Sequence, residues 1–249
     1  MSIVLTTTGL RKQFGGLTAV SDFSLNLQSS EIVGLIGPNG AGKTTIFNLL
    51  TGVYKADAGT IKLNDVNIAA LTPDRVTASG IARTFQNIRL FREMSVIENV
   101  KVGFETRRKS GLFGSLLRKP SFRTEERQIE QDALELLRLL GVETQAHNRS
   151  GNLPYGQQRK LEIARALATS PRVLLLDEPA AGMNESESAS LRQLLLQIRD
   201  KFELTMLVIE HDMPFVMGLA RRLLVLDHGT VIAEGTPAEI RSNPAVMEA

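Results

Sequence analysis

The chain has 249 residues, of which 43% are apolar, and its 29 Lys and Arg against 27 Asp and Glu leave a net charge of only +2. This balance is unlike the strongly basic composition of a nucleic-acid-binding protein, and the apolar content suffices for one compact unit with a sizeable core. The lack of cysteine excludes disulfides and thiolate metal sites and suits a reducing compartment. The N-terminus lacks a signal-peptide layout, and no apolar run approaches the roughly 20 residues of a membrane span, so we expect a soluble or peripheral protein.

The N-terminal part predicts strands around a glycine-rich loop. Residues 3–10 (IVLTTTGL) and 23–28 (FSLNLQ) alternate apolar and polar side chains, which is typical of half-buried antiparallel strands. The apolar run 32–36 predicts a buried strand, followed by a tight loop and by a helical pattern through Leu50. A further strand is expected within residues 58–68 (AGTIKLNDVNI).

Residues 95–141 interrupt this pattern and are expected to be helical. Within them, residues 105–123 carry a local charge of 6 − 1 = +5, from one acid, Glu105, and six basic residues: Arg107, Arg108, Lys109, Arg118, Lys119 and Arg123. This stretch is either a solvated insertion or a surface that faces anionic lipid headgroups or a membrane partner, since each Lys or Arg near a bilayer contributes about 1 kcal/mol. The next segment predicts a packed helix from the spacing of Ile129, Ala133, Leu136, Leu137 and Leu140.

The C-terminal half alternates helices and strands. We expect a helix over 156–169, a strand in 173–179 (VLLLDEP), a helix with one apolar face, and a strand in 205–212 (TMLVIEHD). A helix, a hairpin over 223–235 and a short last helix follow. The helix between the strands in 173–179 and 205–212 has an apolar face that comprises Leu191, Leu194, Leu195, Ile198 and Phe202. The order predicts an α/β fold with a mostly parallel core sheet covered by helices and an N-terminal antiparallel β part.

The glycine-rich loop predicts a nucleotide triphosphate site. Residues 37–44 (GPNGAGKT) fit the pattern G-x-x-x-x-G-K-[ST] in the required strand-loop-helix context. Glycines let successive backbone N–H groups surround the phosphates, Lys43 supplies a positive charge, and the Thr44 hydroxyl is a ligand for Mg²⁺.

Four polar side chains follow predicted strands and agree with this site. Asp177 is expected to hold the metal, directly or through water, and Glu178 to polarise an attacking water. Gln86 could donate to the water shell of the metal, and His211 could contact the γ-phosphate.

A second anion site is indicated by residues 153–157 (LPYGQ). This polar turn precedes an amphipathic helix whose apolar stripe contains Leu161, Ala164, Leu167 and Ala168. The turn would present backbone N–H groups and the positive end of the helix dipole, which favour an anion.

In this order, the segments GPNGAGKTT, TFQN, LPYGQQRKLEIARAL, VLLLDEP and VIEHD resemble the ATP-binding subunit of an ABC transporter over essentially the whole chain. The resemblance implies a single P-loop ATPase domain, with a nucleotide-binding core in 1–85 and 170–249 and a helical subdomain in about 86–169. It implies ATP and Mg²⁺ as cofactors, with two ATP molecules enclosed in a head-to-tail dimer.

The resemblance also assigns roles to residues. Phe14 would stack on adenine, with Val20 beside it. The phosphates would be bound by Gly37, Pro38, Asn39, Gly40, Ala41, Gly42, Lys43, Thr44 and Thr45. Catalysis is assigned to Glu178, His211, Lys43 and Gln86, and the metal to Thr44, Asp177 and Gln86. The signature would face the γ-phosphate of the ATP that the glycine loop of the partner subunit holds, and it comprises Leu153, Pro154, Tyr155, Gly156 and Gln157.

A narrower resemblance, carried by YGQQRKLEIARAL, LLLDEPAAGMN, ARTFQNIRLFREMSVIENV and the basic insertion, is to ATPase subunits for branched-chain amino acid uptake. It implies that the partners of this chain are a second ATPase subunit and two integral-membrane permease subunits. An external solute-binding protein would act with them indirectly, and no nucleic acid is expected as a partner. We therefore expect a cytoplasmic protein, peripheral on the cytoplasmic face of the plasma (inner) membrane.

Three residues depart from the family pattern. Pro154 stands where the family usually has serine, which removes a hydroxyl for the γ-phosphate. Asn184 stands where it usually has aspartate, at a position for communication across the dimer. Phe14 replaces the commoner tyrosine and keeps the stacking face.

Other functions stay open at this point. They are the ATPase of another ABC system, such as lipopolysaccharide export, and an ABC-type regulator that does not hydrolyse ATP. An ABC ATPase acting on DNA or ribosomes would be expected to carry a long coiled-coil insertion or two copies of each motif, and this chain has neither. The transported solute and the choice between homodimer and heterodimer are not determined by the residues.

Overall fold

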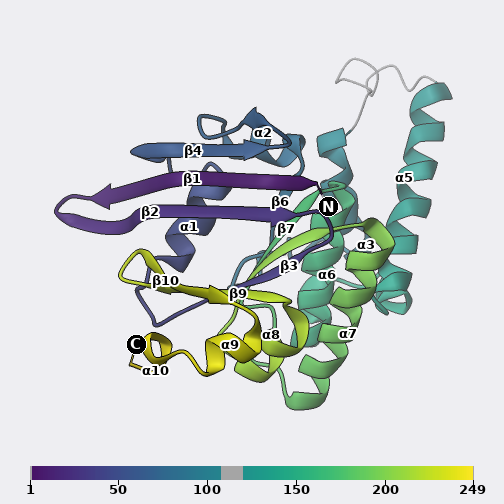
Figure 1. The fold of residues 1–249 in the computed structure, drawn as a ribbon. Helices are drawn as coiled ribbons and strands as arrows, with labels where there is room; N and C mark the ends of the chain where they lie inside the picture. Colours follow the sequence, from purple (N-terminus) through teal and green to yellow (C-terminus); the bar gives the residue numbers. More distant parts are fainter. Residues whose placement is uncertain (1, 108–119, 249) are drawn as a thin grey trace. The chain divides into compact units, whose positions relative to one another are not determined.

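The structure is a computed structural model that describes residues 2–107 and 120–248 (Figure 1). The chain divides into two compact units, one formed by Met1–Gln86 with Arg172–Ala249 and the other by Asn87–Pro171. Most of the basic insertion, residues 105–123, lies outside the described residues. The structure therefore tests neither the solvated-insertion nor the membrane-facing interpretation of it.

The first unit contains an antiparallel sheet in the order β2-β1-β4-β5. Its strands are β1 (Ile3–Phe14), β2 (Leu17–Gln28), β4 (Ala58–Leu63) and β5 (Val66–Asn67). Buried side chains alternate with more exposed ones along parts of β1 and β2, as at Phe23, Leu25 and Leu27, which is expected for a sheet with one covered face. The N-terminal antiparallel part of the predicted fold is confirmed.

The second sheet of this unit has the order β10-β9-β3-β8-β7-β6. Neighbouring strands pair in parallel except for β10, which forms an antiparallel hairpin with β9. The strands are β3 (Ile32–Ile36), β6 (Ile81–Arg83), β7 (Val173–Asp177), β8 (Thr205–Ile209), β9 (Arg222–Asp227) and β10 (Thr230–Gly235). The carboxyl ends of β3, β6, β7 and β8 therefore meet at one edge, where such sheets bind ligands.

Helices cover both faces of this sheet. They are α1 (Lys43–Leu50), α2 (Pro73–Ser79), α7 (Glu185–Phe202), α8 (Met213–Leu219), α9 (Pro237–Arg241) and α10 (Pro244–Glu248). Phe47 and Leu50 of α1 belong to one core cluster with side chains of β1, β2 and the parallel strands, so α1 packs between the two sheets (Figure 1). On the opposite face, the backbone of Gly34 closely approaches Val216 of α8. The predicted apolar face of α7 is buried except at its last residue, Phe202, whose exposed fraction is 41% because the helix ends there.

The second unit is helical, as expected. Its described residues form α3 (Val96–Phe104), α5 (Pro120–Leu139), α6 (Tyr155–Ala168) and the 3-10 turns Glu105–Arg107, Glu143–Gln145 and Ser150–Asn152. A capping box between Ser95 and Glu98 begins α3. The apolar stripes predicted for α5 and α6 are buried. Across residues 2–107 and 120–248, no helix combines the length and apolar character that crossing a membrane requires.

Candidate active site

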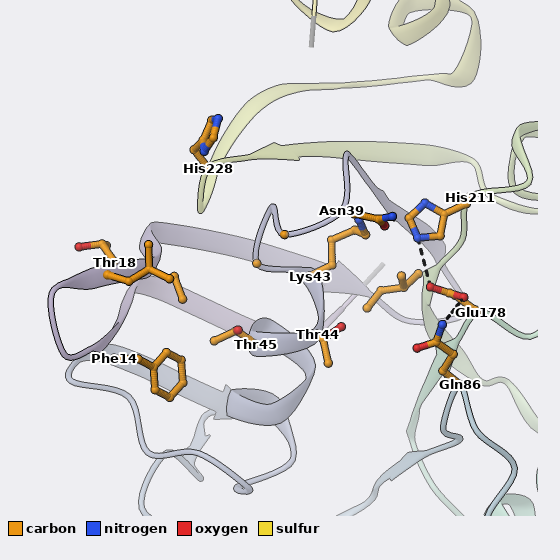
Figure 2. Close-up of a pocket in the computed structure, with 15 residues that line it drawn as sticks. Phe14, Thr18, Asn39, Lys43, Thr44, Thr45, Gln86, Glu178, His211 and His228 are labelled. Carbon is orange, nitrogen blue, oxygen red and sulfur yellow. Dashed lines mark hydrogen bonds and ion pairs between the residues drawn. The ribbon is translucent and has the colours of Figure 1, made fainter.

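A pocket of about 440 Å³ lies at the carboxyl edge of the parallel sheet in the first unit. Figure 2 shows Phe14 and Thr18 at one end of it and Gln86, Glu178 and His211 at the other, with Lys43 and Thr44 between them. The pocket is therefore elongated, with an aromatic end, a glycine loop and a cluster of polar side chains.

The glycine loop between β3 and α1 closes tightly on the chain at both ends and is open in its middle. A Cβ on Gly37 (φ 146°) would come within 2.0 Å of the Leu226 carbonyl oxygen, and one on Gly42 (φ 104°) within 2.3 Å of the Ala19 carbonyl oxygen. Beside Gly40 (φ 83°) nothing lies within 4 Å of that position. Close backbone contacts therefore require glycine at positions 37 and 42, and the open space beside Gly40 fits a phosphate group.

Lys43 lies inside this loop. Its Nζ donates hydrogen bonds to the carbonyl oxygens of Gly37 and Pro38, at 2.6 and 2.8 Å. Burial lowers the pKa of Lys43 from its ordinary value, and the negative charges of Glu178 and Asp177 oppose this shift. The ammonium group therefore faces two carboxylates while it holds the loop.

Glu178 is held from both sides. Its Oε2 accepts a hydrogen bond from Gln86 Nε2 at 2.9 Å, and its Oε1 lies 3.1 Å from His211 Nε2 (Figure 2). Glu178 has φ 48°, in the left-handed region that non-glycine residues rarely adopt, and its N–H donates to the Ile209 carbonyl at 2.9 Å. Three residues predicted from separate strand ends are thus brought together, and strain of this kind is found at functional sites.

Asp177 does not line the pocket. Its carboxylate is buried at the end of β7, and Oδ2 accepts a hydrogen bond from Arg83 Nη2 at 2.7 Å. Thr44, Thr45 and Asn39 do line the pocket, whereas Ala41 is buried and its carbonyl accepts from the Gly229 N–H at 2.9 Å. The glycine-loop residues therefore divide into those that face the pocket and those that shape the loop.

At the other end, Phe14 is 41% exposed and contacts Tyr54 edge to face, with ring centroids 5.1 Å apart. Val20 does not line the pocket, because the alternation of β2 places its side chain in the core, and Ala19 lines it instead. Thr18, Leu17, Ile209 and His228 also line the pocket and were not predicted. The turn before β2 and the His-Gly turn between β9 and β10 were the available signals, but neither has a distinctive motif.

A buried carboxylate that the sequence did not single out lies next to this cluster. Glu210 accepts hydrogen bonds from the N–H groups of Ala180, His211 and Asp212, at 2.7, 2.9 and 3.2 Å. Burial raises the pKa of Glu210, and the three backbone donors oppose this rise. Glu210 therefore links the loop after Glu178 to the backbone of His211.

Asn184, which departs from the family pattern, caps α7. Its Oδ1 accepts from the Glu187 N–H, and Glu187 Oε2 accepts from the Asn184 N–H, both at 3.0 Å. Asparagine and aspartate serve equally well as such caps, so this substitution leaves the start of α7 intact.

The predicted signature begins α6 in the second unit. Pro154 is the N-cap and has no side-chain capping bond, but its carbonyl accepts from the N–H groups of Gln157 and Gln158, at 2.9 and 3.0 Å. Within the described part of the chain, the N–H groups of Tyr155 and Gly156 have no acceptor. This helix start can therefore donate hydrogen bonds to an anion.

Comparisons with known proteins identify the family of this chain. The family described as ABC transporter matches residues 20–181, and the family described as Branched-chain amino acid ATP-binding cassette transporter matches residues 230–249. The chain is 48% identical to the high-affinity branched-chain amino acid transport ATP-binding protein LivG of Escherichia coli (strain K12), over 99% of this chain and 96% of that protein. It is 42% identical, with the same coverage, to the corresponding protein BraF of Pseudomonas aeruginosa.

Among solved structures, the ADP conformation of MJ1267, an ATP-binding cassette of an ABC transporter, superposes with a TM-score of 0.86. Its sequence is 32% identical, and the match covers 100% of this chain and 98% of that one. The chain belongs to the ABC transporter family and is one of its ATP-binding subunits, which couple ATP hydrolysis to transport.

Proposed function

We propose that this chain binds Mg²⁺·ATP in the described pocket and hydrolyses it to drive uptake of branched-chain amino acids. The observation that carries the catalytic part is the cluster in which Gln86 and His211 hold both oxygens of Glu178. The substrate part is supported by the similarity to LivG and BraF over nearly the whole chain.

The pocket suits the nucleotide along its length. The exposed face of Phe14 offers a surface on which adenine can stack. The loop N–H groups and Lys43 would bind the phosphates, and the open space beside Gly40 admits them. Thr44, with Asp177 directly or through water and Gln86 through water, would hold Mg²⁺, which when bound supplies charge neutralisation for the phosphates.

Phosphoryl transfer to water requires mainly positioning and charge stabilisation from the protein. Glu178 would accept the proton of the attacking water, because its carboxylate lies at the end of the pocket opposite Phe14, beyond the glycine loop, and is fixed in direction. Gln86 keeps that carboxylate in place, and His211, which lies beside it, would turn its N–H from Glu178 to the γ-phosphate when ATP is bound. Lys43 stabilises the charge that accumulates on the phosphate oxygens.

A second subunit would complete the site. The start of α6, with the free N–H groups of Tyr155 and Gly156, would contact the γ-phosphate held by the glycine loop of a partner ATPase subunit. Two permease subunits and, indirectly, an external solute-binding protein would form the rest of the importer. In this proposal the chain works as a peripheral protein on the cytoplasmic face of the plasma (inner) membrane.

ATP turnover by the chain and by Glu178→Gln tests the catalytic part. We expect the variant to bind Mg²⁺·ATP and to lose at least about 100-fold in kcat, as is typical when a positioned proton acceptor is removed. Glu203→Gln is the matched control. Glu203 is also a glutamate with a left-handed backbone conformation, but it caps the C-terminus of α7 and does not line the pocket. Full turnover in Glu178→Gln would refute this role.

Leucine uptake tests the transport part. Membrane vesicles that contain the chain with its permeases and are supplied with the solute-binding protein outside should accumulate leucine when ATP is enclosed, and vesicles with Glu178→Gln should not. If the vesicles hydrolyse ATP but accumulate no branched-chain amino acid, the chain is still an ABC ATPase and the proposed solute class is rejected.

A further inference from the structure

Arg83 is a buried cation that none of the roles above uses. It ends β6, three residues before Gln86, and its side chain is 6% exposed. Nη1 donates to Asn48 Oδ1 at 2.6 Å and Nη2 donates to Asp177 Oδ2 at 2.7 Å. One guanidinium group therefore connects α1 to the end of β7.

Both partners belong to elements of the pocket. Asn48 is four residues after Thr44 on α1, so the two side chains lie on the same face of that helix. Asp177 directly precedes Glu178. Arg83 thus sets the position of the helix that carries Lys43 and Thr44 relative to the strand that carries the two carboxylates.

Aromatic rings restrict the guanidinium further. Its Cζ lies 5.3 Å from the ring centroid of Phe47 on α1 and 4.9 Å from that of Phe85, which directly precedes Gln86. An arginine held by two hydrogen bonds and two ring contacts has one orientation, which the flexible ammonium of a lysine would not reproduce.

Fold stability alone is a weak explanation for this arrangement. A buried ion pair contributes little net stability, because both charges lose their hydration, and apolar residues of similar volume often serve as well. In addition, Arg83 Nε is buried and has no hydrogen-bond partner in the described part of the chain. Because burying Arg83 costs free energy, its presence is better explained by a function that requires the Asp177 carboxylate in a fixed orientation.

We infer that Arg83 is a positioning residue for the metal site: it anchors Asp177 Oδ2 and, through Asn48, the Thr44 face of α1, and thereby leaves Asp177 Oδ1 to bind Mg²⁺ directly or through a water molecule. Among the described residues, Oδ1 accepts no hydrogen bond. This inference rests on the proposed binding of Mg²⁺·ATP, and it assigns to Arg83 the geometry of the metal ligands rather than contact with the nucleotide.

Binding measurements without turnover test it. In a Glu178→Gln background, the affinity for a fluorescent ATP analogue is measured by titration with Mg²⁺ and in the presence of EDTA. We expect Arg83→Met to leave the affinity in EDTA within about twofold and to weaken the Mg²⁺-dependent gain about tenfold. Arg83→Lys keeps the charge but cannot bridge Asn48 and Asp177, so it should restore only part of the gain.

Asn48→Ala and Arg222→Met are the two companion variants. Asn48→Ala removes only one anchor and should weaken the Mg²⁺-dependent gain about threefold, so it decides the question if Arg83→Met does not fold. Arg222→Met, at the opposite end of the sheet, breaks the ion pairs with Glu31 and Glu234 and should lower thermal stability without changing the Mg²⁺ dependence.

The outcomes separate the inference from the proposed function. An unchanged or stronger Mg²⁺ dependence in folded Arg83→Met, or in Asn48→Ala if that protein alone folds, would overturn the positioning role while the metal site stands. A parent protein whose affinity does not respond to Mg²⁺ would overturn the proposed metal site, and the role of Arg83 with it.

Discussion

Two glycines of the glycine loop should respond differently to substitution by alanine. Gly42 has φ 104°, and an added Cβ would lie 2.3 Å from the Ala19 carbonyl oxygen, a backbone atom that cannot move without shifting β2. The unfavourable backbone conformation costs about 1–2 kcal/mol, and the forced displacement about 1–3 kcal/mol more. We expect Gly42→Ala to lower the free energy of unfolding of the nucleotide-free protein by about 2–5 kcal/mol.

Gly40→Ala isolates the effect on binding. Gly40 also has positive φ, 83°, but nothing lies within 4 Å of the added Cβ, so only the conformational cost of about 1–2 kcal/mol applies. The methyl group would enter the space that the phosphates require. We expect the affinity for ATP to fall at least about tenfold, which corresponds to about 1.4 kcal/mol.

Urea denaturation of nucleotide-free protein and calorimetric titration with Mg²⁺·ATP measure the two effects. Gly16→Ala is the control, because Gly16 has no positive φ and open space around it, so it should be as stable as the parent or slightly more so. Equal stability of Gly42→Ala and Gly40→Ala, or normal ATP affinity in Gly40→Ala, would refute this account of the loop.

Three further outcomes are expected. In a Glu178→Gln background with Mg²⁺·ATP, Pro154→Ser should strengthen self-association about 10²–10⁴-fold by sedimentation, since a hydroxyl–phosphate hydrogen bond contributes about 1.5–3 kcal/mol at each of two sites. Burial lowers the pKa of Lys43, so the unfolded chain binds that proton more tightly and the free energy of unfolding rises as pH increases from the lowered pKa toward 10.5. Lys43→Met should lack this rise in urea denaturation at alkaline pH values up to 10.5. Glu210→Ala leaves three backbone donors unpaired and should lower the free energy of unfolding by about 2–4 kcal/mol, against under about 1 kcal/mol for the exposed Glu239→Ala.

Local patterns were sufficient for the elements and for the main motifs. The β-strands of the first unit follow from alternation or from continuous apolar runs, and α5 and α6 follow from apolar spacing, because burial of one face depends on the period of the element. The resemblance to a known family depended on short segments in a fixed order, and the comparisons confirm it.

Local sequence patterns did not predict how each strand pairs with its neighbours or where a helix ends. Val20 was expected at the adenine end, but β2 has irregular pairing with β1 between Val20 and Phe23, with Asp22 at φ 54°, and its alternation turns Val20 into the core. Only the fold shows that Ala19, rather than Val20, faces the pocket. Similarly, Phe202 fits the period of α7 but is exposed where the helix ends.

The sequence by itself determined the α/β class, the phosphate loop and the identity of the strand-end residues, because these depend on neighbours within one element. Only the tertiary structure decided which of these side chains meet: Glu178 with Gln86 and His211, and Asp177 with Arg83 and, through it, Asn48. Those partners lie from 33 to 94 residues apart along the chain. Their contacts follow from the parallel order of β6, β7 and β8 and from the packing of α1 against them, which no local pattern specifies.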